Sequence, residues 1–358
     1  MRMRTIGQAW TAGGNNFDMI RLVAALSVIV SHAFFVHTGD NALEPLREST
    51  GYPLGWHAVQ VFFVLSGFLV LASLERRESV AAFLAARAAR IMPGLILVSL
   101  SAVFILGPLV TSLPLRQYFD PVAIVDFLGK TLFEFDTDTS LPGVFADTPS
   151  DVILGTVWTL KYEVLCYLGL AAAGLLGLHR RGWLLAVAAL ALLGLGAFFR
   201  THPDALAFLG PAKHLLRLGG CFLLGMMAWR WRERIPLNFG ILAALAALAM
   251  VAKQTPFYAP ALYLAEAYAV MWLGFAVPAD SAGLRLPADY SYGLYLFGFP
   301  VQQAIMHYLP ESGPWTNMAI AIPATFALAA FSWHVVEKPF MRMKARAKPA
   351  APALQPAE

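Results

Sequence analysis

Residues 17–37 form a largely apolar run long enough to cross a lipid bilayer, and Asp18, Arg21 and His32 place ionisable side chains within it. Ionisable side chains in a spanning helix are costly and usually face the bundle interior or a water-filled cavity, which makes them candidates for function. In one helix, Arg21 and His32 are only about 20° out of register and about 16 Å apart along the axis. One helix face is therefore predicted to carry a cation near one membrane surface and an imidazole toward the other. The alternative is an interfacial Asp18–Arg21 ion pair, with His32 bonded to a backbone carbonyl.

A carboxylate and an ammonium group, Glu163 and Lys161, lie near the start of another apolar run, at 157–178. The order of the runs predicts that Glu163 and His32 lie at matching depth. A carboxylate near an imidazole raises the pKa of the imidazole and fixes its tautomer, as suits a base that takes a hydroxyl proton. We interpret His32 and Glu163 as candidate catalytic residues. A structural pair of Glu163 with Lys161 or with an arginine is the alternative.

Two further arginines, Arg87 and Arg90, lie in the segment 79–91, which is predicted to be a short amphipathic helix along the inner membrane surface. Together with Arg21 they form a candidate phosphate site, because the planar guanidinium fork pairs phosphate oxygens bidentately. A donor held there by phosphates, with an arm of ~15 to 20 Å, would place its reactive end near His32. Coenzyme A has that shape. Ordinary decoration of cytoplasmic loops with arginine is the alternative.

Other polar and small residues within the apolar runs are interpreted as structural. Ser66 and Gly67 lie at mid-membrane, where small residues permit close helix approach, and Gly67 is predicted to be a helix contact. Glu266 is predicted to pair with a histidine or an arginine. Structural pairing is also favoured, over contact with an acceptor or lipid, for Lys213, His214 and Arg217. Tryptophans at the ends of the runs are interpreted as interfacial anchors: Trp56, Trp158, Trp229, Trp231 and Trp315.

The composition explains why these polar residues stand out. The chain has 358 residues, of which 58% are hydrophobic and 13% charged, and its mean hydropathy is +0.62. These values exclude an ordinary soluble domain and indicate an integral membrane protein. The net charge of +4 arises mainly in short loops, so it reports orientation and contact with anionic lipid rather than binding to nucleic acid. The two cysteines, Cys166 and Cys221, lie within apolar runs and form no disulfide or zinc pattern, so no metal is expected.

The fold class expected is an all-α, polytopic membrane protein of about ten transmembrane helices. The apolar runs are about 17–37, 56–74, 92–112, 157–178, 182–199, 212–230, 237–253, 258–277, 289–308 and 315–336. Arginine and lysine follow the second, fourth, sixth and last runs, whereas the loop 113–156 is acidic. The positive-inside rule therefore predicts that both termini are cytoplasmic.

Three regions are predicted along the chain. Residues 1–16 form a cytoplasmic N-terminal segment, and residues 17–340 form one transmembrane domain without an internal repeat. Residues 341–358 form a basic, Ala/Pro-rich tail that is predicted to be disordered.

Six blocks, in order along the chain, resemble the membrane-bound acyltransferase-3 family, whose members transfer acyl groups to hydroxyls of bacterial polysaccharides, lipopolysaccharide and related glycans. The blocks are DMIRLVAALSVIVSH with its Arg-x10-His spacing, VFFVLSGFL, FLAARAARIMP with its Arg-x2-Arg pair, VWTLKYEVLCYL, SYGLYLFGFPVQQ and VVEKP. Some relatives carry an appended periplasmic domain, and the chain is expected to resemble the stand-alone form that lacks it.

The resemblance implies acyl-CoA, most simply acetyl-CoA, as donor, and a glycan or lipid-linked glycan as acceptor. It implies that His32 is essential and that Arg21, Arg87 and Arg90 bind the donor or are structurally essential. Supporting roles are assigned to Asp18, Ser66, Lys161 and Tyr295.

The predicted function is therefore acyl transfer to a hydroxyl of a cell-envelope or exported glycan, in a bacterial inner membrane, with His32 as general base. An acyl-imidazole intermediate is the competing mechanism. The alternatives from other classes are a transporter or flippase of lipid-linked glycan or a small molecule, and an inactive scaffold. A transporter is expected to show repeated halves, and the sequence has no repeat.

Overall fold

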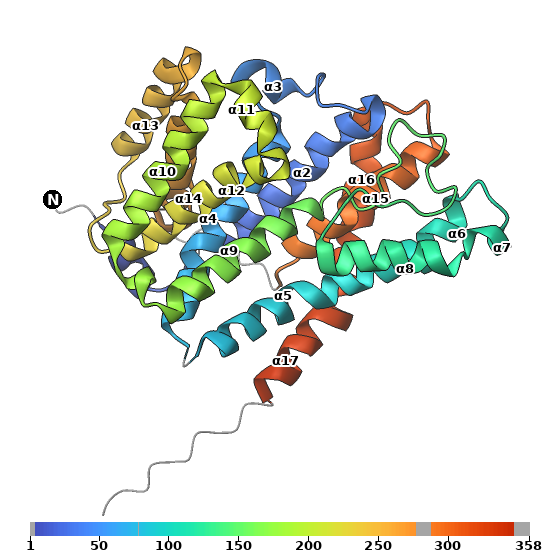
Figure 1. Cartoon of the computed structure of the whole chain (residues 1–358), viewed down its shortest axis with the longest axis horizontal. Coiled ribbons are helices and arrows are strands. Elements are labelled where there is room, and N and C mark those ends of the chain that lie inside the picture. The colour runs from blue at the N-terminus through green and yellow to red at the C-terminus, as the bar shows by residue number, and fades with distance from the viewer. Residues whose placement is uncertain (1–3, 78, 277–287, 347–358) are drawn as a thin grey trace, which may run out of the picture.

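The computed structural model describes residues 4–77, 79–276 and 288–346. These residues fold almost entirely as helices, and the described part contains no β-strand beyond two isolated bridges. The predicted all-α class is confirmed (Figure 1).

The helices of the first half are α1 (Ile6–Thr11), α2 (Phe17–Thr38), α3 (Pro45–Thr50), α4 (Leu54–Glu75), α5 (Val80–Ser101), η1 (Ala102–Leu106), α6 (Gly107–Val110), α7 (Leu115–Tyr118), α8 (Pro121–Gly129), η2 (Lys130–Glu134) and α9 (Trp158–Leu175). Those of the second half are η3 (Leu178–Arg180), α10 (Gly182–Thr201), α11 (Pro203–Phe208), η4 (Gly210–Ala212), α12 (Lys213–Arg230), α13 (Phe239–Val251), η5 (Ala252–Gln254), α14 (Tyr258–Ala276), α15 (Ser291–Tyr308), α16 (Pro314–Phe331), η6 (Ser332–Glu337) and α17 (Lys338–Arg346).

Helical segments occupy all ten predicted apolar runs. Within the described residues, five helical stretches are long and apolar enough to cross a membrane: Phe17–Thr38, Leu54–Glu75, Val80–Val110, Gly182–Thr201 and Pro314–Met343. The protein is thus a helical membrane protein. The count of ten spans and the cytoplasmic position of both ends stay predictions.

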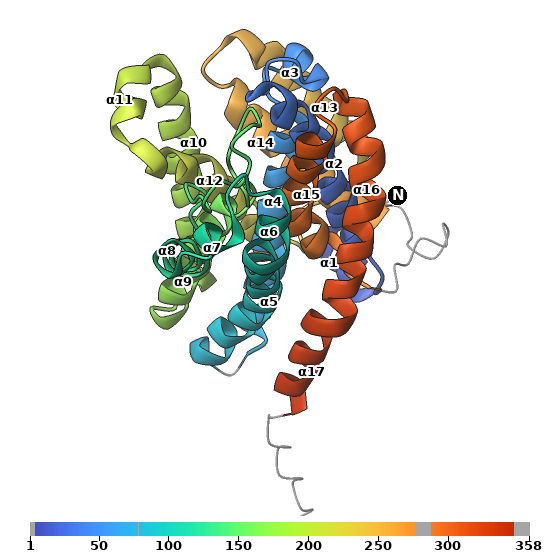
Figure 2. The ribbon, with the colours of Figure 1, turned by 90° about the vertical axis from the view of Figure 1, so that its right-hand side faces the viewer.

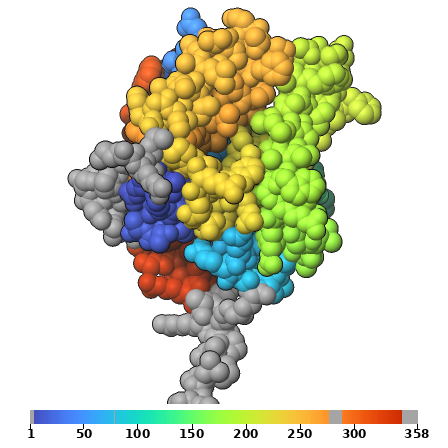
Figure 3. All heavy atoms as spheres, turned by 90° about the vertical axis from the view of Figure 1, so that its left-hand side faces the viewer, coloured from blue at the N-terminus to red at the C-terminus, as the bar shows by residue number. Residues whose placement is uncertain are grey.

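Helix α4 is the centre of the bundle. It contacts α2, α5, α9, α12 and α14, and Figure 1 shows it among most of these helices. In the apolar 18-residue segment of α4, 78% of the residues are buried, whereas 17% are buried in the corresponding segment of α10. Helix α10 is therefore peripheral. Figure 3 shows α10 and α13 at the surface of one face of the molecule. The exposed apolar side chains of α10, such as Leu190, suit contact with lipid.

Helices α4 and α12 pack with their backbones in close contact. A Cβ atom built on Gly67 would lie 1.9 Å from the carbonyl oxygen of Phe222, and one built on Gly225 would lie 2.0 Å from that of Val64. The prediction that Gly67 is a helix contact is confirmed. Only glycine permits this approach, because any side chain would separate the two backbones.

Replacing Gly67 with Ala is expected to destabilise the protein by about 1 to 3 kcal/mol, because overpacking forces the two helices apart. Gly194→Ala is the matched control, since Gly194 is also helical but a Cβ atom added to it would have no neighbouring atom within 4 Å. Thermal stability in detergent, followed by fluorescence-detected size-exclusion chromatography, should fall for Gly67→Ala and stay level for Gly194→Ala. Equal stability of the two variants would contradict the assigned contact.

The arginine segment 79–91 differs from its prediction. It is not a separate interfacial helix but the first half of one continuous helical stretch, Val80–Val110, in which α5, η1 and α6 follow one another. The helix continues through Pro93, and Phe83 in its first turn is fully buried. The hydropathy pattern missed this continuity because Arg87 and Arg90 interrupt the apolar run.

The C-terminal region also differs in part. Residues 341–346, expected in the disordered tail, belong to α17, and Figure 2 shows α16 continuing through η6 into α17 along the side of the bundle. Residues 347–358 lie outside the described residues. At the other end, the segment predicted as 1–16 contains α1, which is closed by a capping box between Thr5 and Gln8 and buries Ile6 completely.

Candidate functional site

Two cavities lie on neighbouring parts of the bundle core. The arginine cavity, of about 120 Å³, is lined by residues that include Arg21, Arg87, Arg90, Glu163, Tyr167 and Tyr295. The histidine cavity, of about 390 Å³, is lined by residues that include His32, Trp56, Trp158, His214, Arg217 and Phe299. Arg21 and His32, both on α2, therefore line two adjacent cavities rather than one.

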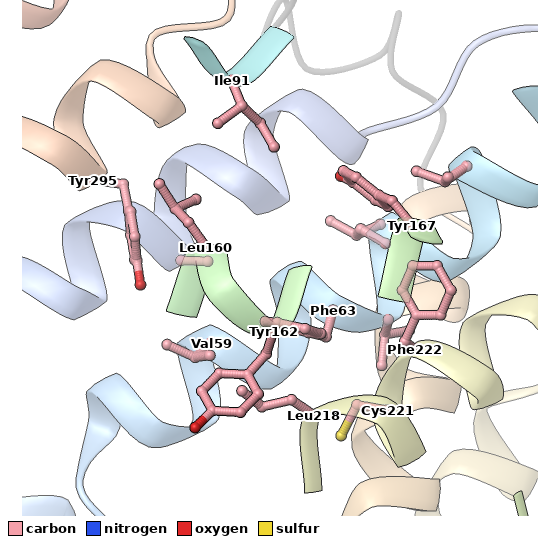
Figure 4. Close-up of a cluster of buried hydrophobic side chains, with 14 of the residues drawn as sticks. Val59, Phe63, Ile91, Leu160, Tyr162, Tyr167, Leu218, Cys221, Phe222 and Tyr295 are labelled. Carbon is pink, nitrogen blue, oxygen red and sulfur yellow. The ribbon is translucent and has the colours of Figure 1, made fainter. Parts of the chain in front are cut away.

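A thin partition separates the two cavities. Val59 of α4 and Tyr295 of α15 line both of them, and Figure 4 shows Val59 and Leu160 beside the ring of Tyr295. The Tyr295 hydroxyl forms a 2.6 Å hydrogen bond with the hydroxyl of Thr159 and donates to the Thr156 carbonyl at 3.3 Å. These bonds fix the Tyr295 ring between the cavities.

His32 has an unusual environment. Its Nδ1 atom is buried and has no hydrogen-bond partner among the described residues. The ring meets Phe299 edge to face at 5.2 Å between centroids. The alternative in which His32 bonds a backbone carbonyl is therefore not observed. A buried imidazole nitrogen without a partner is costly for stability, which favours a role in binding or catalysis.

Glu163 lines the arginine cavity and does not pair with His32. Its carboxylate accepts hydrogen bonds from the hydroxyls of Ser66, at 3.3 Å, and Tyr167, and these two hydroxyls are 3.0 Å apart. Glu163 and Tyr167 are four residues apart and share a helix face. The predicted support of His32 by Glu163 through direct contact is thus corrected.

The alternative pairing of Glu163 with Lys161 is also absent, since Lys161 lies 3.9 Å from Asp136 instead. Residues two apart on a helix do not face each other. Ser66 forms polar contacts with Glu163 and Tyr167 in addition to the packing role that was predicted for it.

Arg90 holds together three segments that are distant in sequence. It donates to Asp289, just before α15, at 2.6 Å and to Glu337, in η6, at 2.8 Å. Glu337 is only 1% exposed and also accepts from Ser332 at 2.8 Å. Arg90 is therefore a structural ion-pair centre on the wall of the arginine cavity.

The guanidinium of Arg21 also has carboxylate neighbours. It lies 3.4 Å from Asp18 and 3.8 Å from Asp289, so the interfacial Asp18–Arg21 pair exists alongside a second contact. Asp289 is thus shared between Arg21 and Arg90.

Arg87 has fewer polar partners than Arg21 or Arg90. It forms no ion pair with a described carboxylate, and its buried Nε has no hydrogen-bond partner there. Its guanidinium lies 5.9 Å from the centroid of the Tyr167 ring. A guanidinium on a cavity wall with free donors is suited to an anionic ligand.

Part of the acidic loop 113–156 forms one wall of the histidine cavity. Thr137 and Val152 of this loop line the cavity. Gln303 of α15 donates to the carbonyl oxygens of Ser150, at 2.7 Å, and Val152, at 2.8 Å. The loop is thereby fixed to α15.

Several site residues were missed or were given another role by the sequence. Tyr167, Asp289 and Glu337 had no assigned role, although Glu337 lies in the VVEKP block and Asp289 lies two residues before SYGLYLFGFPVQQ. Trp56 and Trp158, interpreted as interfacial anchors, line the histidine cavity. Glu266 does pair with a histidine, as predicted, at 2.5 Å from His57.

The chain is similar to known proteins over most of its length. A family model described as "Acyltransferase domain" matches residues 15–334. The chain is 30% identical to an "O-acetyl transferase" of Shigella phage Sf6, over 91% of this chain and 96% of the relative. It is 29% identical to "Nodulation protein 10" of Rhizobium leguminosarum bv. viciae, over 92% of this chain and 94% of the relative. No solved structure matches.

Proposed function

Because the chain belongs to this acyltransferase family, we propose that it transfers an acyl group, most simply acetyl, from acyl-CoA to a hydroxyl of a cell-envelope or exported glycan in a bacterial inner membrane. The observation that carries the proposal is the pair of adjacent cavities, one rich in guanidinium groups and one holding His32, with Tyr295 between them. The relative named as an O-acetyl transferase supports transfer to oxygen.

The donor is proposed to bind by its phosphates at the arginine cavity. Arg87 supplies the free guanidinium, while Arg90 and Arg21 add positive charge and are themselves held by carboxylates. The arm of coenzyme A then extends past Val59 and Tyr295 toward His32, over a distance close to the ~16 Å rise between Arg21 and His32. To admit the thioester, the Tyr295 hydroxyl must leave its hydrogen bonds with Thr159 and Thr156, and the ring must turn aside.

The reaction is proposed to use His32 as general base. The imidazole takes the proton of the acceptor hydroxyl as its oxygen attacks the thioester carbonyl, the C–S bond breaks, and the thiolate of coenzyme A accepts the proton from the imidazolium. Glu163 acts within the donor cavity by holding the hydroxyls of Ser66 and Tyr167. An acyl-imidazole on His32 is the competing route.

The proposal is tested with purified protein, radiolabelled acetyl-CoA and candidate glycans in sealed vesicles. Label that becomes covalently attached to a glycan supports the acyltransferase. Movement of a glycan across the vesicle membrane, without incorporation of label, would instead indicate a transporter or flippase.

Replacing Arg87 with Glu is expected to weaken acyl-CoA binding by roughly 10- to 100-fold, because a charge-assisted contact to phosphate is lost and a repulsion is introduced. Isothermal titration with coenzyme A measures the effect. Arg180→Glu, at an exposed arginine in η3, is the matched control and should leave binding unchanged. If Arg87→Glu raised the KM for the acceptor while donor binding stayed normal, the donor site would have to lie elsewhere.

A further inference from the structure

Arg217, on α12, is the fixed cation of the histidine cavity. The described residues that line this cavity include His32, His214 and Arg217 but no aspartate or glutamate. Arg217 also forms no ion pair with any carboxylate in the described ranges. Glu266 is instead bonded to His57. The cavity that holds the proposed base therefore carries positive charge that no acidic side chain of its wall balances.

The guanidinium of Arg217 is held in place by an aromatic stack. It lies 5.1 Å from the centroid of the Trp56 ring and donates to the Trp56 carbonyl oxygen at 3.4 Å. Trp56 in turn stacks on Tyr52 at 3.8 Å between centroids, with their planes 2° apart, and the Tyr52 hydroxyl accepts from Arg200 at 2.9 Å. Preorganisation of this kind lowers the entropy lost when a guanidinium binds an anion.

Taken together, the charge and the geometry point to a ligand. A half-buried guanidinium that faces a cavity of about 390 Å³ without a carboxylate partner is desolvated at a cost. An anion that enters the cavity restores the balance and gains a charge-assisted, bidentate contact. The cavity volume lies within the range of small-molecule sites.

We propose that Arg217 is an anion subsite for the acceptor, so that the preferred acceptor carries a carboxylate or phosphate close to the hydroxyl that is acylated. This inference rests on the proposed function, because it places the acceptor in the cavity of His32. The shared chemistry is an anionic oxygen group next to a sugar ring. It is supplied either by a uronic acid residue of the glycan or by the diphosphate that joins a sugar to a lipid carrier.

The test measures binding of two anionic probes and their neutral counterparts to the full-length protein in lipid nanodiscs. One pair is a glucuronic acid disaccharide and the same disaccharide with its carboxylate reduced to an alcohol. The other is a monosaccharide linked through a diphosphate to a short prenyl chain and the same sugar on a neutral alkyl chain. The fluorescence of Trp56, in contact with Arg217, gives a local signal when compared with a Trp56→Phe variant.

The wild-type protein is expected to bind one anionic probe roughly 10- to 100-fold more tightly than its neutral counterpart. Arg217→Met should remove that preference, Arg217→Lys should keep part of it, and neither should change binding of coenzyme A. Preference for the uronate or for the diphosphate identifies the source of the anion.

Two results would overturn the subsite: a wild-type protein without preference for either anionic probe, or an Arg217→Met variant that retains the preference. The wild-type comparison needs no variant, so a folding defect does not remove the test. A separate measurement tests the proposed function: if no label passes from acetyl-CoA to any acceptor, the proposed function is wrong. The two tests are independent, because binding of the probes does not require catalysis.

Discussion

Replacing His32 with Ala is expected to lower acyl transfer by about 10²- to 10⁴-fold, the usual contribution of a positioned general base. The loss should appear in kcat, measured as label transferred from acetyl-CoA at saturating donor and acceptor. Binding of coenzyme A should be unchanged, because the phosphates are proposed to bind at Arg87, in the other cavity. The variant should also fold, because the buried Nδ1 of His32 bonds to no described group. Removal of the imidazole therefore leaves no group without the hydrogen bond that Nδ1 would have made.

A matched histidine makes this result specific. His202, at the end of α10, is exposed and stacks on Phe198, so His202→Ala should transfer label at the wild-type rate. Near-normal transfer by His32→Ala would refute the assignment of the base. The competing acyl-imidazole route is distinguished by incubating the wild-type protein with labelled acetyl-CoA and no acceptor. Label that remains on the protein, and is absent from His32→Ala, would favour the covalent intermediate.

The positions of Arg21 and His32 illustrate what local periodicity can predict. The spacing of 3.6 residues per turn places both side chains on the same face of α2. In the structure, both of them line cavities in the core. The close contact at Gly67 was predictable for a similar reason, because a glycine in the middle of an apolar helix permits an approach that other residues prevent.

The partners of the polar residues could not be predicted in the same way. Asp289 and Glu337 lie 199 and 247 positions from Arg90 in the chain, so only the tertiary fold brings them together. Matching depth suggested that Glu163 would meet His32, but depth does not fix rotation about a helix axis. The rotation of α9 directs Glu163 toward Ser66 of α4 and the arginine cavity.

Composition alone did not show that aromatic and basic residues at run ends line a cavity. Trp56 and Arg217 look like an interfacial anchor and a structural cation, because both are common at the membrane surface. In the fold, Arg217 contacts the Trp56 ring and both line the cavity of His32. The stack could be recognised only once α4 and α12 were seen to pack against each other.

Replacing Arg90 with Met is expected to prevent stable folding. The substitution leaves Glu337, which is 1% exposed, and Asp289 without their strongest partner, and removal of one member of a buried ion pair costs about 3 to 5 kcal/mol. A cost of this size is a large part of the total stability of most proteins. The measurement is the yield of monodisperse protein extracted from membranes, followed with a fluorescent fusion.

A second variant removes the carboxylate that Arg90→Met leaves unpaired. Combining Arg90→Met with Glu337→Gln neutralises the buried carboxylate and should recover part of the yield, because an unpaired amide is less costly to bury than an unpaired carboxylate. Arg87→Met is the matched control on the same cavity wall. Arg87 has no ion pair to lose among the described residues, so this variant should fold normally and bind coenzyme A weakly. An Arg90→Met protein that folds like the wild type and loses only donor binding would instead make Arg90 a phosphate ligand, and Arg87 and Arg90 would then share one role.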